Sequence, residues 1–386
     1  MRSPTRRVFL VTAAASLAYK AFPQTYTIPE AIRNLRPMTD GTQSIKSEEH
    51  QARIEKARRL MRENRIDAIL MEGGSSTFYF TGSRSNEVAL IFSGSGASWS
   101  GKADLAPKAL KDQGVSTGRL GVEERVRFEL VDRIGKALPA LEFVSADPVT
   151  AGCRMIKSPA ELALMQRAND ITIACYRAAL GTLREGMTQL ELSANIAAGY
   201  KALGVQGDAM AIFGKYTAFP HGSVQPQKLR EGDLVLIDDG CSVEGYQSDV
   251  TRTVIFGKPT QRQRDIWELE RKAQDAALAA AKPGRTCESV DAAARKVITD
   301  YGFGPGYKVP GLPHRTGHGI GLDGHEWPYL VRGNKRLLEP GMCFSDEPTI
   351  AIYGEFGIRL EDCMHITEDG ARTFTKQSPA IDQPFG

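Results

Sequence analysis

The first candidates for chemistry are two aspartates that follow an apolar segment. Leu234–Ile237 predicts a buried strand, runs directly into Asp238, and is followed after a turn by Asp249. If residues 232–240 and 246–254 form a hairpin, the two aspartates lie nearly opposite each other, close enough to touch. Because a buried carboxylate is costly without a cationic partner, this arrangement predicts a positive ion beside them.

A second pair of acids repeats the pattern further along the chain. Glu347 also ends an apolar segment that a glycine precedes, and a turn at Gly354 would bring it near Glu361. Four carboxylates in one place repel each other, and two divalent cations would balance them almost charge for charge. A donor set of oxygens with a few nitrogens suits Mn, Mg, Fe or Co better than a thiolate-type zinc site.

The nitrogen donors come from a group of histidines. Three of the six histidines lie in "PHRTGHGIGLDGHEW" and one lies in "AFPHGS": His314, His318, His325 and His221. The step of seven residues from His318 to His325 lets both face one cavity. Little side-chain bulk surrounds His318, as close approach to a bound centre would need, because its neighbours include Gly317, Gly319 and Gly321.

Residues 152–386 contain an internal repeat. Each half reads as a helix, a second helix after a Gly-x-Thr motif, and a strand that ends in an acid. The motif occurs at Gly186–Thr188 and again at Gly284–Thr286. The repetition predicts two α+β halves related by a pseudo-twofold axis, each directing two carboxylates to the middle. Helix starts are expected at Ser158–Pro159, Thr188–Glu191 and Thr260–Gln263.

Residues 49–151 predict a small α/β domain. An amphipathic helix leads into a strand at Ala68–Met71, and "EERVRFELVDRIGKAL" predicts a second long helix. The segments "TFYFTG", "EVALIF" and "GRLGVE" are expected to be strands. Ser93–Lys102 has no apolar period and predicts a loop.

The N-terminus predicts export. Residues 1–21 combine a basic start, a short apolar segment and small residues, as in a secretory signal, and "TRRVFL" resembles a twin-arginine signal. The alternative is a basic N-terminal tail. Residues 22–48 are polar, contain three prolines and predict a linker with no core of its own. A periplasmic or secreted protein is therefore expected.

Composition excludes several classes of protein. The formal net charge of +3 over 386 residues is small, so nucleic acid is not an expected partner. No apolar stretch is long enough to span a bilayer in the mature protein. The six cysteines form no CxxC pair and are expected to be buried apolar residues, with a Cys343–Cys363 disulfide as the alternative. His50 and His365 are expected to be structural.

The acids and one histidine stand in the order and spacing of a known ligand set. Asp238, Asp249, His318, Glu347 and Glu361 resemble the five metal ligands of the pita-bread metallopeptidases (M24), which include aminopeptidase P and prolidase. The resemblance rests on "IDDGCSVEGYQSDVTRT", "HRTGHGIGLDGHE", "LEPGMCFSDEP" and "GIRLEDCMHIT". It implies a C-terminal pita-bread domain over residues 152–386 and a creatinase/prolidase-like domain, shorter than its usual counterpart, over residues 49–151. The presence of all five ligands argues against a creatinase-like member that works without metals.

The resemblance also implies a role for each site residue. Asp238 would chelate one metal, Asp249 and Glu361 would bridge both, and His318 and Glu347 would complete the second site. Glu347 would act as general base on a metal-bridging hydroxide. Substrate binding and proton transfer would fall to His325 and His221, with His314 at the rim and Arg359 orienting Glu361. Thr349 stands where many members have glycine, at the edge of the pocket.

Together these features predict an exopeptidase with two divalent metal ions per subunit that cleaves the N-terminal Xaa-Pro bond. Manganese is the expected metal, with cobalt, iron or zinc as alternatives. The substrate is either an Xaa-Pro dipeptide or a longer peptide with proline in second position, and the family implies a homodimer. Two alternative functions are a metal-dependent C–N hydrolase or lyase for a small non-peptide substrate, and a non-catalytic peptide-binding homologue.

Overall fold

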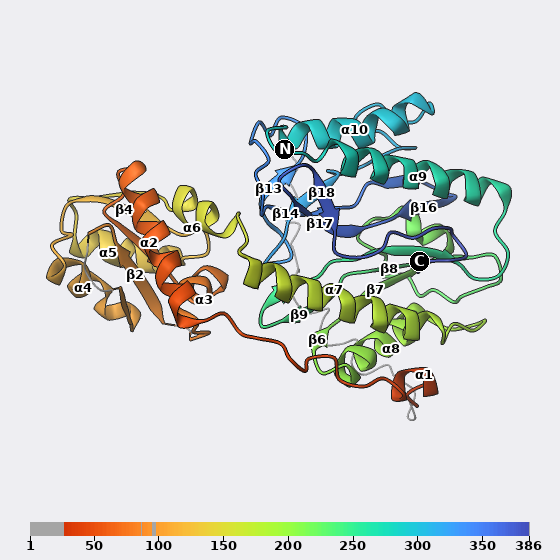
Figure 1. Ribbon diagram of the computed structural model, residues 1–386, viewed down its shortest axis with the longest axis horizontal. Coiled ribbons are helices and arrows are strands. Elements are labelled where there is room, and N and C mark those ends of the chain that lie inside the picture. The colour runs from red at the N-terminus through yellow and green to blue at the C-terminus, as the bar shows by residue number, and fades with distance from the viewer. Residues whose placement is uncertain (1–26, 86, 95–97, 386) are drawn as a thin grey trace, which may run out of the picture.

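The computed structural model describes residues 27–85, 87–94 and 98–385, which form two lobes (Figure 1). The predicted signal, residues 1–21, lies outside the described residues. An N-terminal lobe extends from α2 to α6, and a larger C-terminal lobe begins at α7. Within the described residues, no helix combines the length and apolar character that crossing a membrane requires.

The N-terminal lobe is built on one mixed sheet. Its strands lie in the order β3-β2-β1-β4-β5. Strands β1, β4 and β5 are parallel to one another, whereas β2 is antiparallel to both of its neighbours, β1 and β3. The strands are β1 Ala68–Met71, β2 Val88–Phe92, β3 Trp99–Gly101, β4 Gly118–Val122 and β5 Leu141–Ser145. The helices are α2 Ser47–Glu63, α3 Ser75–Thr81, η2 Ala103–Leu105, α4 Ala106–Asp112, α5 Phe128–Ala137 and α6 Asp147–Arg154.

Helices cover both faces of this sheet. Ile69 and Met71 of β1 belong to the core cluster that includes residues of α2, α3 and α6. Ala68 and Leu70, which point the other way along the same strand, belong to a cluster with α4 and α5. A strand buried on both faces is a continuous apolar run, as β1 is.

Two predictions in this lobe were wrong. "TFYFTG" was expected to be a strand, but it lies in helix α3. Its aromatic residues favour a strand locally, whereas the buried side chains Ser76, Tyr79 and Phe80 recur at helical spacing and pack on the core. Ser93–Lys102 was expected to be a loop, but its last part forms the short edge strand β3.

Part of the predicted linker packs against the C-terminal lobe. The single-turn helix α1, Glu30–Arg33, places Ile32 in the core with 1% of its surface exposed. Further along, Met38 N donates to Leu203 O at 3.0 Å. A helix of one turn has too little periodicity to be predicted from sequence.

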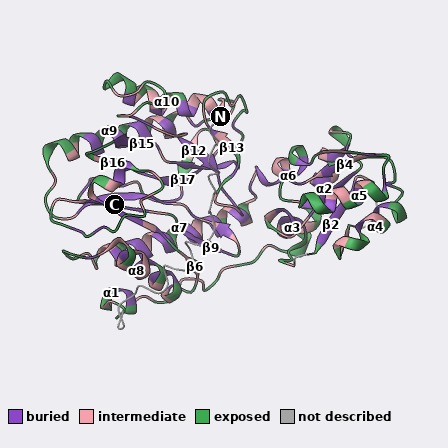
Figure 2. Cartoon of the chain, turned by 180° about the vertical axis from the view of Figure 1, so that it is seen from behind, coloured by how far each residue is buried: buried purple, intermediate pink, exposed green. Residues whose placement is uncertain are grey.

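The strands of the C-terminal lobe lie between two pairs of helices, α7 with α8 and α9 with α10 (Figure 1). The helices are α7 Pro159–Leu180, α8 Gln189–Ala202, η3 Gly214–Ala218, α9 Gln261–Ala280 and α10 Cys287–Asp300. Buried residues line the strands and the inner faces of the helices (Figure 2). Three of these helices begin where predicted, at Ser158, Thr188 and Thr260, and each start is a capping box, which was predicted only for the last two.

The strands of this lobe form several small sheets. They are ordered β11-β8-β7, β10-β9-β6, β13-β12-β14-β17-β18 and β15-β16. The strands of the first half are β6 Gln206–Gly207, β7 Met210–Phe213, β8 Leu234–Asp238, β9 Cys241–Val243, β10 Tyr246–Gln247 and β11 Arg252–Ile255. Those of the second half are β12 Gly317–Gly319, β13 Glu326–Leu330, β14 Cys343–Asp346, β15 Thr349–Ile352, β16 Phe356–Arg359, β17 Asp362–Ile366 and β18 Ala371–Thr373.

The internal repeat is visible in matching hydrogen bonds. Gly186 N donates to Leu229 O at 2.8 Å, and Gly284 N donates to Leu338 O at 2.9 Å. In both halves the accepting leucine stands three residues before a glycine of positive φ that leads into the acid-bearing strand. The two halves therefore repeat the same connections, as predicted.

All six cysteines are buried free thiols. The expectation of buried apolar residues is confirmed, and the alternative Cys343–Cys363 disulfide is not formed. Cys343 pairs with His365 across β14 and β17, while Cys363 faces Ser345. The two thiols therefore belong to different cross-strand pairs.

The repeat generates a prediction with a built-in control. Gly232 and Gly341 have nearly the same φ, 85° and 87°. A Cβ on Gly232 would meet nothing within 4 Å, so Gly232→Ala should cost about 1 kcal/mol of backbone strain. A Cβ on Gly341 would lie 3.0 Å from Lys157 O, so Gly341→Ala should cost about 2–3 kcal/mol. Urea unfolding curves measure both, and equal losses would contradict the difference.

Candidate metal centre

The predicted ligands lie at strand ends in the middle of the C-terminal lobe. Asp238 ends β8, and His318 is the central residue of β12. The other three occupy connections that follow or precede strands: Asp249 after β10, Glu347 after β14 and Glu361 between β16 and β17. Because β8 and β14 are equivalent strands of the two halves, the repeat directs both sets of acids to one place.

The donor atoms of the predicted ligands form two adjacent groups, and His325 forms a third group with Asp249 and His318. Asp238, Asp249 and Glu361 offer atoms within 4.8 Å of one another, as do His318, Glu347 and Glu361. Glu361 belongs to both groups. His318 Nε2 lies 3.2 Å from Glu347 Oε1 and 3.6 Å from Asp249 Oδ2, so Asp249 also borders the second group. Two neighbouring ion sites that share carboxylate ligands would need this arrangement of the five residues.

The route by which Asp249 reaches Asp238 differs from the predicted hairpin. The β8–β11 register pairs Ile237 with Arg252, so the next position opposite Asp238 is Thr251. The chain between them is irregular: Asp239 has φ 129°, and a Cβ on Gly240 would lie 2.1 Å from Ser248 O. This irregular segment, instead of direct strand pairing, brings Asp249 beside Asp238.

The second pair of acids follows the predicted arrangement. Across β15 and β16 Thr349 pairs with Arg359, and across β14 and β17 Asp346 pairs with Asp362. Both registers place Glu347 opposite Glu361. The turn that joins β15 to β16 contains Gly354, as expected.

Burial opposes the negative charge of these acids. Burial and then the neighbouring Asp238 raise the pKa of Asp249 well above its usual value. Burial and then Asp249 do the same to the pKa of Glu361, and burial raises the pKa of Glu347 to about 7. A cation among these oxygens would stabilise their ionised forms.

Two further observations fit divalent cations in this position. The Oε1 atom of Glu361 is buried and has no hydrogen-bond partner in the protein. The ring of His318 is held by Nδ1, which lies 3.1 Å from Gly319 O, so the Nε2 lone pair faces the acids. Burial and then His325 lower the pKa of His318 well below its usual value, which keeps the ring neutral as a metal ligand requires. The donor set is compatible with two divalent ions.

The glycines around His318 lie in close contact with neighbouring segments. A Cβ on Gly317 would lie 2.1 Å from Ser345 O, and one on Gly319 would lie 2.6 Å from Glu326 O. A Cβ on Gly321 would lie 2.8 Å from Lys157 Cε. These glycines permit close packing of β12 and the segment after it against their neighbours.

Arg359 contacts a different carboxylate from the expected one. We predicted that it orients Glu361, but its Nη2 forms an ion pair with Asp238 Oδ2. Its Nη1 donates to Pro220 O at 3.1 Å, which ties the segment before His221 to the acid cluster. The direct partner therefore differs from the predicted one, and Arg359 reaches Glu361 through Thr251 Oγ1, to which its Nε donates at 3.1 Å. Residues 359 and 361 alternate along the chain, so sequence favours contact between them, and only the pairing of distant strands brings Asp238 to the guanidinium.

Thr251 is a site residue that the sequence reasoning missed. Its Oγ1 lies 2.5 Å from Asp238 Oδ1 and 2.6 Å from Glu361 Oε2, and Arg359 Nε donates to it at 3.1 Å. The sequence could have indicated Thr251 by its position two residues after Asp249, because alternate residues of an extended segment share a face.

The remaining histidines gather on one side of the acids. The ring centroids of His325 and His318 are 4.0 Å apart. His314 is fixed at both nitrogens, with Nδ1 2.7 Å from Arg315 O and Nε2 2.9 Å from Thr349 Oγ1. Burial, together with Arg359 and His221 nearby, lowers the pKa of His314 to about 3. His221 is exposed and also helps to lower the pKa of His325, which places these three rings close together.

Arg315 was also missed by the sequence reasoning. Its Nη2 lies 3.2 Å from His325 Nδ1, and its guanidinium lies over the ring of Tyr329, 4.9 Å from the centroid. No pattern marks it, since it is one arginine within a histidine-rich segment. The two histidines expected to be structural lie elsewhere: His50 Nδ1 is 3.0 Å from Tyr79 O, and His365 lies in β17.

Comparison with known proteins identifies both lobes. The family model for metallopeptidase family M24 matches residues 163–368 of this chain. The family model for the creatinase/prolidase N-terminal domain matches residues 53–100 and 95–156. The Xaa-Pro dipeptidase of Pyrococcus furiosus is 31% identical over 84% of this chain and 97% of its own length. The Xaa-Pro dipeptidase of Lactobacillus delbrueckii is 40% identical over 60% of this chain and 62% of its own.

Solved structures agree with these relatives. A dipeptidase from Pyrococcus horikoshii superposes with a TM-score of 0.79 at 28% identity, covering 85% of this chain and 99% of that one. An X-Pro aminopeptidase from Thermotoga maritima superposes with a TM-score of 0.73 at 27% identity, covering 83% and 97%. The predicted pita-bread fold with an N-terminal α/β domain is confirmed. This chain belongs to metallopeptidase family M24.

Proposed function

We propose that this protein is a metal-dependent exopeptidase that hydrolyses the bond between an N-terminal residue and a following proline. The observation that carries the proposal is the complete donor set, arranged as two groups that share Glu361. The printed names of the relatives support the substrate class, since they include Xaa-Pro dipeptidases and an X-Pro aminopeptidase. An Xaa-Pro bond is a tertiary amide without an N–H, so a specialised peptidase is needed for it.

The same residues would hold the two ions. Asp238, Asp249 and Glu361 would bind one ion, and His318, Glu347 and the shared carboxylates would bind the other. When bound, the ions lower the pKa of water and polarise the scissile carbonyl. We propose manganese for both sites, with cobalt, iron or zinc as alternatives, because oxygens outnumber nitrogens in the donor set.

Residues of the chain supply the remaining steps. Glu347, whose Oε1 accepts from Ser345 Oγ at 3.2 Å, is placed to accept a proton from the attacking water. His325 and His221 lie beside the acids and are suited to bind the peptide and to stabilise the charge that develops on its carbonyl oxygen. His314 supports this rim. Arg359 positions Asp238 and the His221 segment together.

Two further proposals concern the whole protein. The twin-arginine-like N-terminus supports export to the periplasm or the medium, which cell fractionation tests. The N-terminal domain supports a homodimer by analogy with the family, which analytical ultracentrifugation tests. The mature protein is proposed to act on peptides without nucleic-acid or membrane partners.

The substrate class has a direct test. Purified protein is assayed with an Xaa-Pro dipeptide, an Xaa-Pro-Yaa tripeptide and proline-free peptides of matched length, while metal content is measured. We expect about two divalent ions per chain and cleavage of proline-containing peptides only, because the donor groups fit two ions. Removal of the ions by a chelator should abolish activity, and re-addition should restore it.

Matched variants locate the activity. Asp249→Ala should reduce kcat at least a thousandfold and leave the circular dichroism spectrum unchanged, because the carboxylate borders both ion groups. Asp265→Ala, on the exposed face of α9, is the control and should retain activity. Activity surviving in the Asp249 variant would defeat the two-metal mechanism.

Thr349 generates a second prediction at the rim. Its Oγ1 is 2.9 Å from His314 Nε2, a contact that a valine of the same shape would remove. Thr349→Val should lower kcat/KM about 3- to 10-fold, since a hydrogen bond of this kind contributes about 1 kcal/mol. Thr349→Ser should keep most of the activity. Equal activity in the two variants would show that the contact does not matter.

A further inference from the structure

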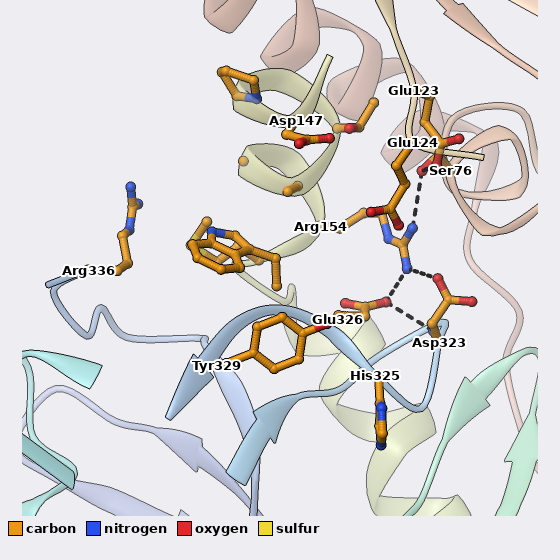
Figure 3. A pocket seen from close by; sticks show the side chains of 16 residues that line it. Ser76, Glu123, Glu124, Asp147, Arg154, Asp323, His325, Glu326, Tyr329 and Arg336 are labelled. Carbon is orange, nitrogen blue, oxygen red and sulfur yellow. Dashed lines mark hydrogen bonds and ion pairs between the residues drawn. The ribbon is translucent and has the colours of Figure 1, made fainter. Parts of the chain in front are cut away.

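A buried ionic cluster joins the two lobes beside the metal centre (Figure 3). Arg154, the last residue of α6, extends into the C-terminal lobe and is 9% exposed. Its Nη1 donates to Ser76 Oγ at 3.1 Å within its own lobe. Its Nη2 donates to Asp323 Oδ2 at 2.6 Å and to Glu326 Oε1 across the junction.

Both carboxylates have further partners. Glu326 Oε2 forms an ion pair with Lys157 Nζ at 3.1 Å. Asp323 Oδ1 accepts from Ser75 Oγ at 2.7 Å and pairs with Arg125 Nη2 at 3.2 Å, both in the N-terminal lobe. The backbone N–H of Asp323 also donates to Glu326 Oε1 at 3.0 Å. The two acids therefore close a short turn and fasten it to the other lobe.

The cluster is tightly packed and stays charged. Burial would raise the pKa of Glu326, but Lys157 and Arg154 lower it to about 2. A Cβ on Gly321 would lie 2.8 Å from Lys157 Cε and 2.9 Å from Glu326 Oε2, so no space remains for a side chain there. Breaking such a buried pair from one side leaves an uncompensated charge, so the cluster resists rearrangement.

His325 lies inside the turn that this cluster closes. It stands between Asp323 and Glu326 in the chain and forms one edge of the cavity in Figure 3. Its side chain is exposed, with Arg315 Nη2 at 3.2 Å and the ring of His318 alongside. Few side-chain contacts are therefore available to hold the ring, and the backbone on either side of it is the main restraint.

We propose that Arg154 is a positioning residue, which sets the location of His325 through Asp323 and Glu326. The inference rests on the proposed function of His325 in stabilising the charge that develops on the carbonyl oxygen of the substrate. The N-terminal lobe thereby acts on the metal centre without contributing a ligand to it. A purely structural role would instead let Arg154 stabilise the junction without acting through His325.

A double-mutant cycle separates these roles. Arg154→Met, His325→Ala and the double variant are assayed in metal-loaded, full-length protein on an Xaa-Pro dipeptide. Alone, Arg154→Met should lower kcat about 10- to 100-fold, with KM changed less than about threefold and metal content unchanged. In the His325→Ala background the same substitution should change kcat less than about twofold, because its target is already gone.

Two further variants control for misfolding and for the loss of an arginine elsewhere in the N-terminal lobe. Arg154→Lys keeps the positive charge but lacks the forked N–H donors of the guanidinium, so it should recover part of kcat. It replaces Arg154→Met in the cycle if the methionine variant does not fold. Arg127→Met is the matched control, because Arg127 pairs with Glu72 inside the N-terminal lobe and is 69% exposed. It should behave as wild type.

A readout that needs no turnover completes the design. The rate at which diethyl pyrocarbonate modifies His325, followed by mass spectrometry, should rise several-fold in Arg154→Met, while that of His365 stays constant. Multiplicative losses in the cycle, or an unchanged modification rate, would overturn the positioning role. Wild-type protein that cleaves no Xaa-Pro peptide would refute the proposed function, and the modification rate would still decide whether Arg154 positions His325.

Discussion

The burial of several carboxylates around one point is the constraint on which the C-terminal lobe depends. Glu361 is buried, Asp249 and Glu347 keep only a small exposed surface, and this burial raises the pKa values of all three acids. Such a cluster is unfavourable by itself, because desolvation and mutual repulsion add. Divalent cations remove both penalties, so the acids that oppose folding when alone become the ligands of the ions that the protein uses.

The internal repeat is the means by which these acids meet. Each half places a glycine of positive φ before an apolar strand and an acid at the end of that strand. One half alone would present only two of the four carboxylates. Two halves facing each other enclose the site from both sides. Thr251 contacts Asp238 and Glu361, which come from different halves, and Arg359 of the second half pairs with Asp238 of the first.

The N-terminal lobe contributes to the same site from outside. Core residues of α2 and β1 form one cluster with residues of α7, so the lobes share a continuous apolar contact. The ionic cluster around Arg154 lies at this junction and ends beside His325. The arrangement explains why a domain without a metal ligand accompanies the metal-binding domain: it restrains the segment that carries an exposed histidine.

The sequence by itself determined the ligand types and most of the elements of the C-terminal lobe. Apolar runs that end in acids, a glycine-flanked histidine and the repeated Gly-x-Thr motif are local patterns, and each survives in the structure because it reflects local backbone and side-chain chemistry. Only the tertiary structure decided which residues touch. Four features depend on register and on contacts between distant segments: the irregular backbone at Asp239, the pairing of Arg359 with Asp238, the helix at Ser75–Thr81 and the Arg154 cluster. A register shift of one residue moves every side chain of a strand to the opposite face of the sheet. Local sequence patterns do not reveal which register distant strands adopt.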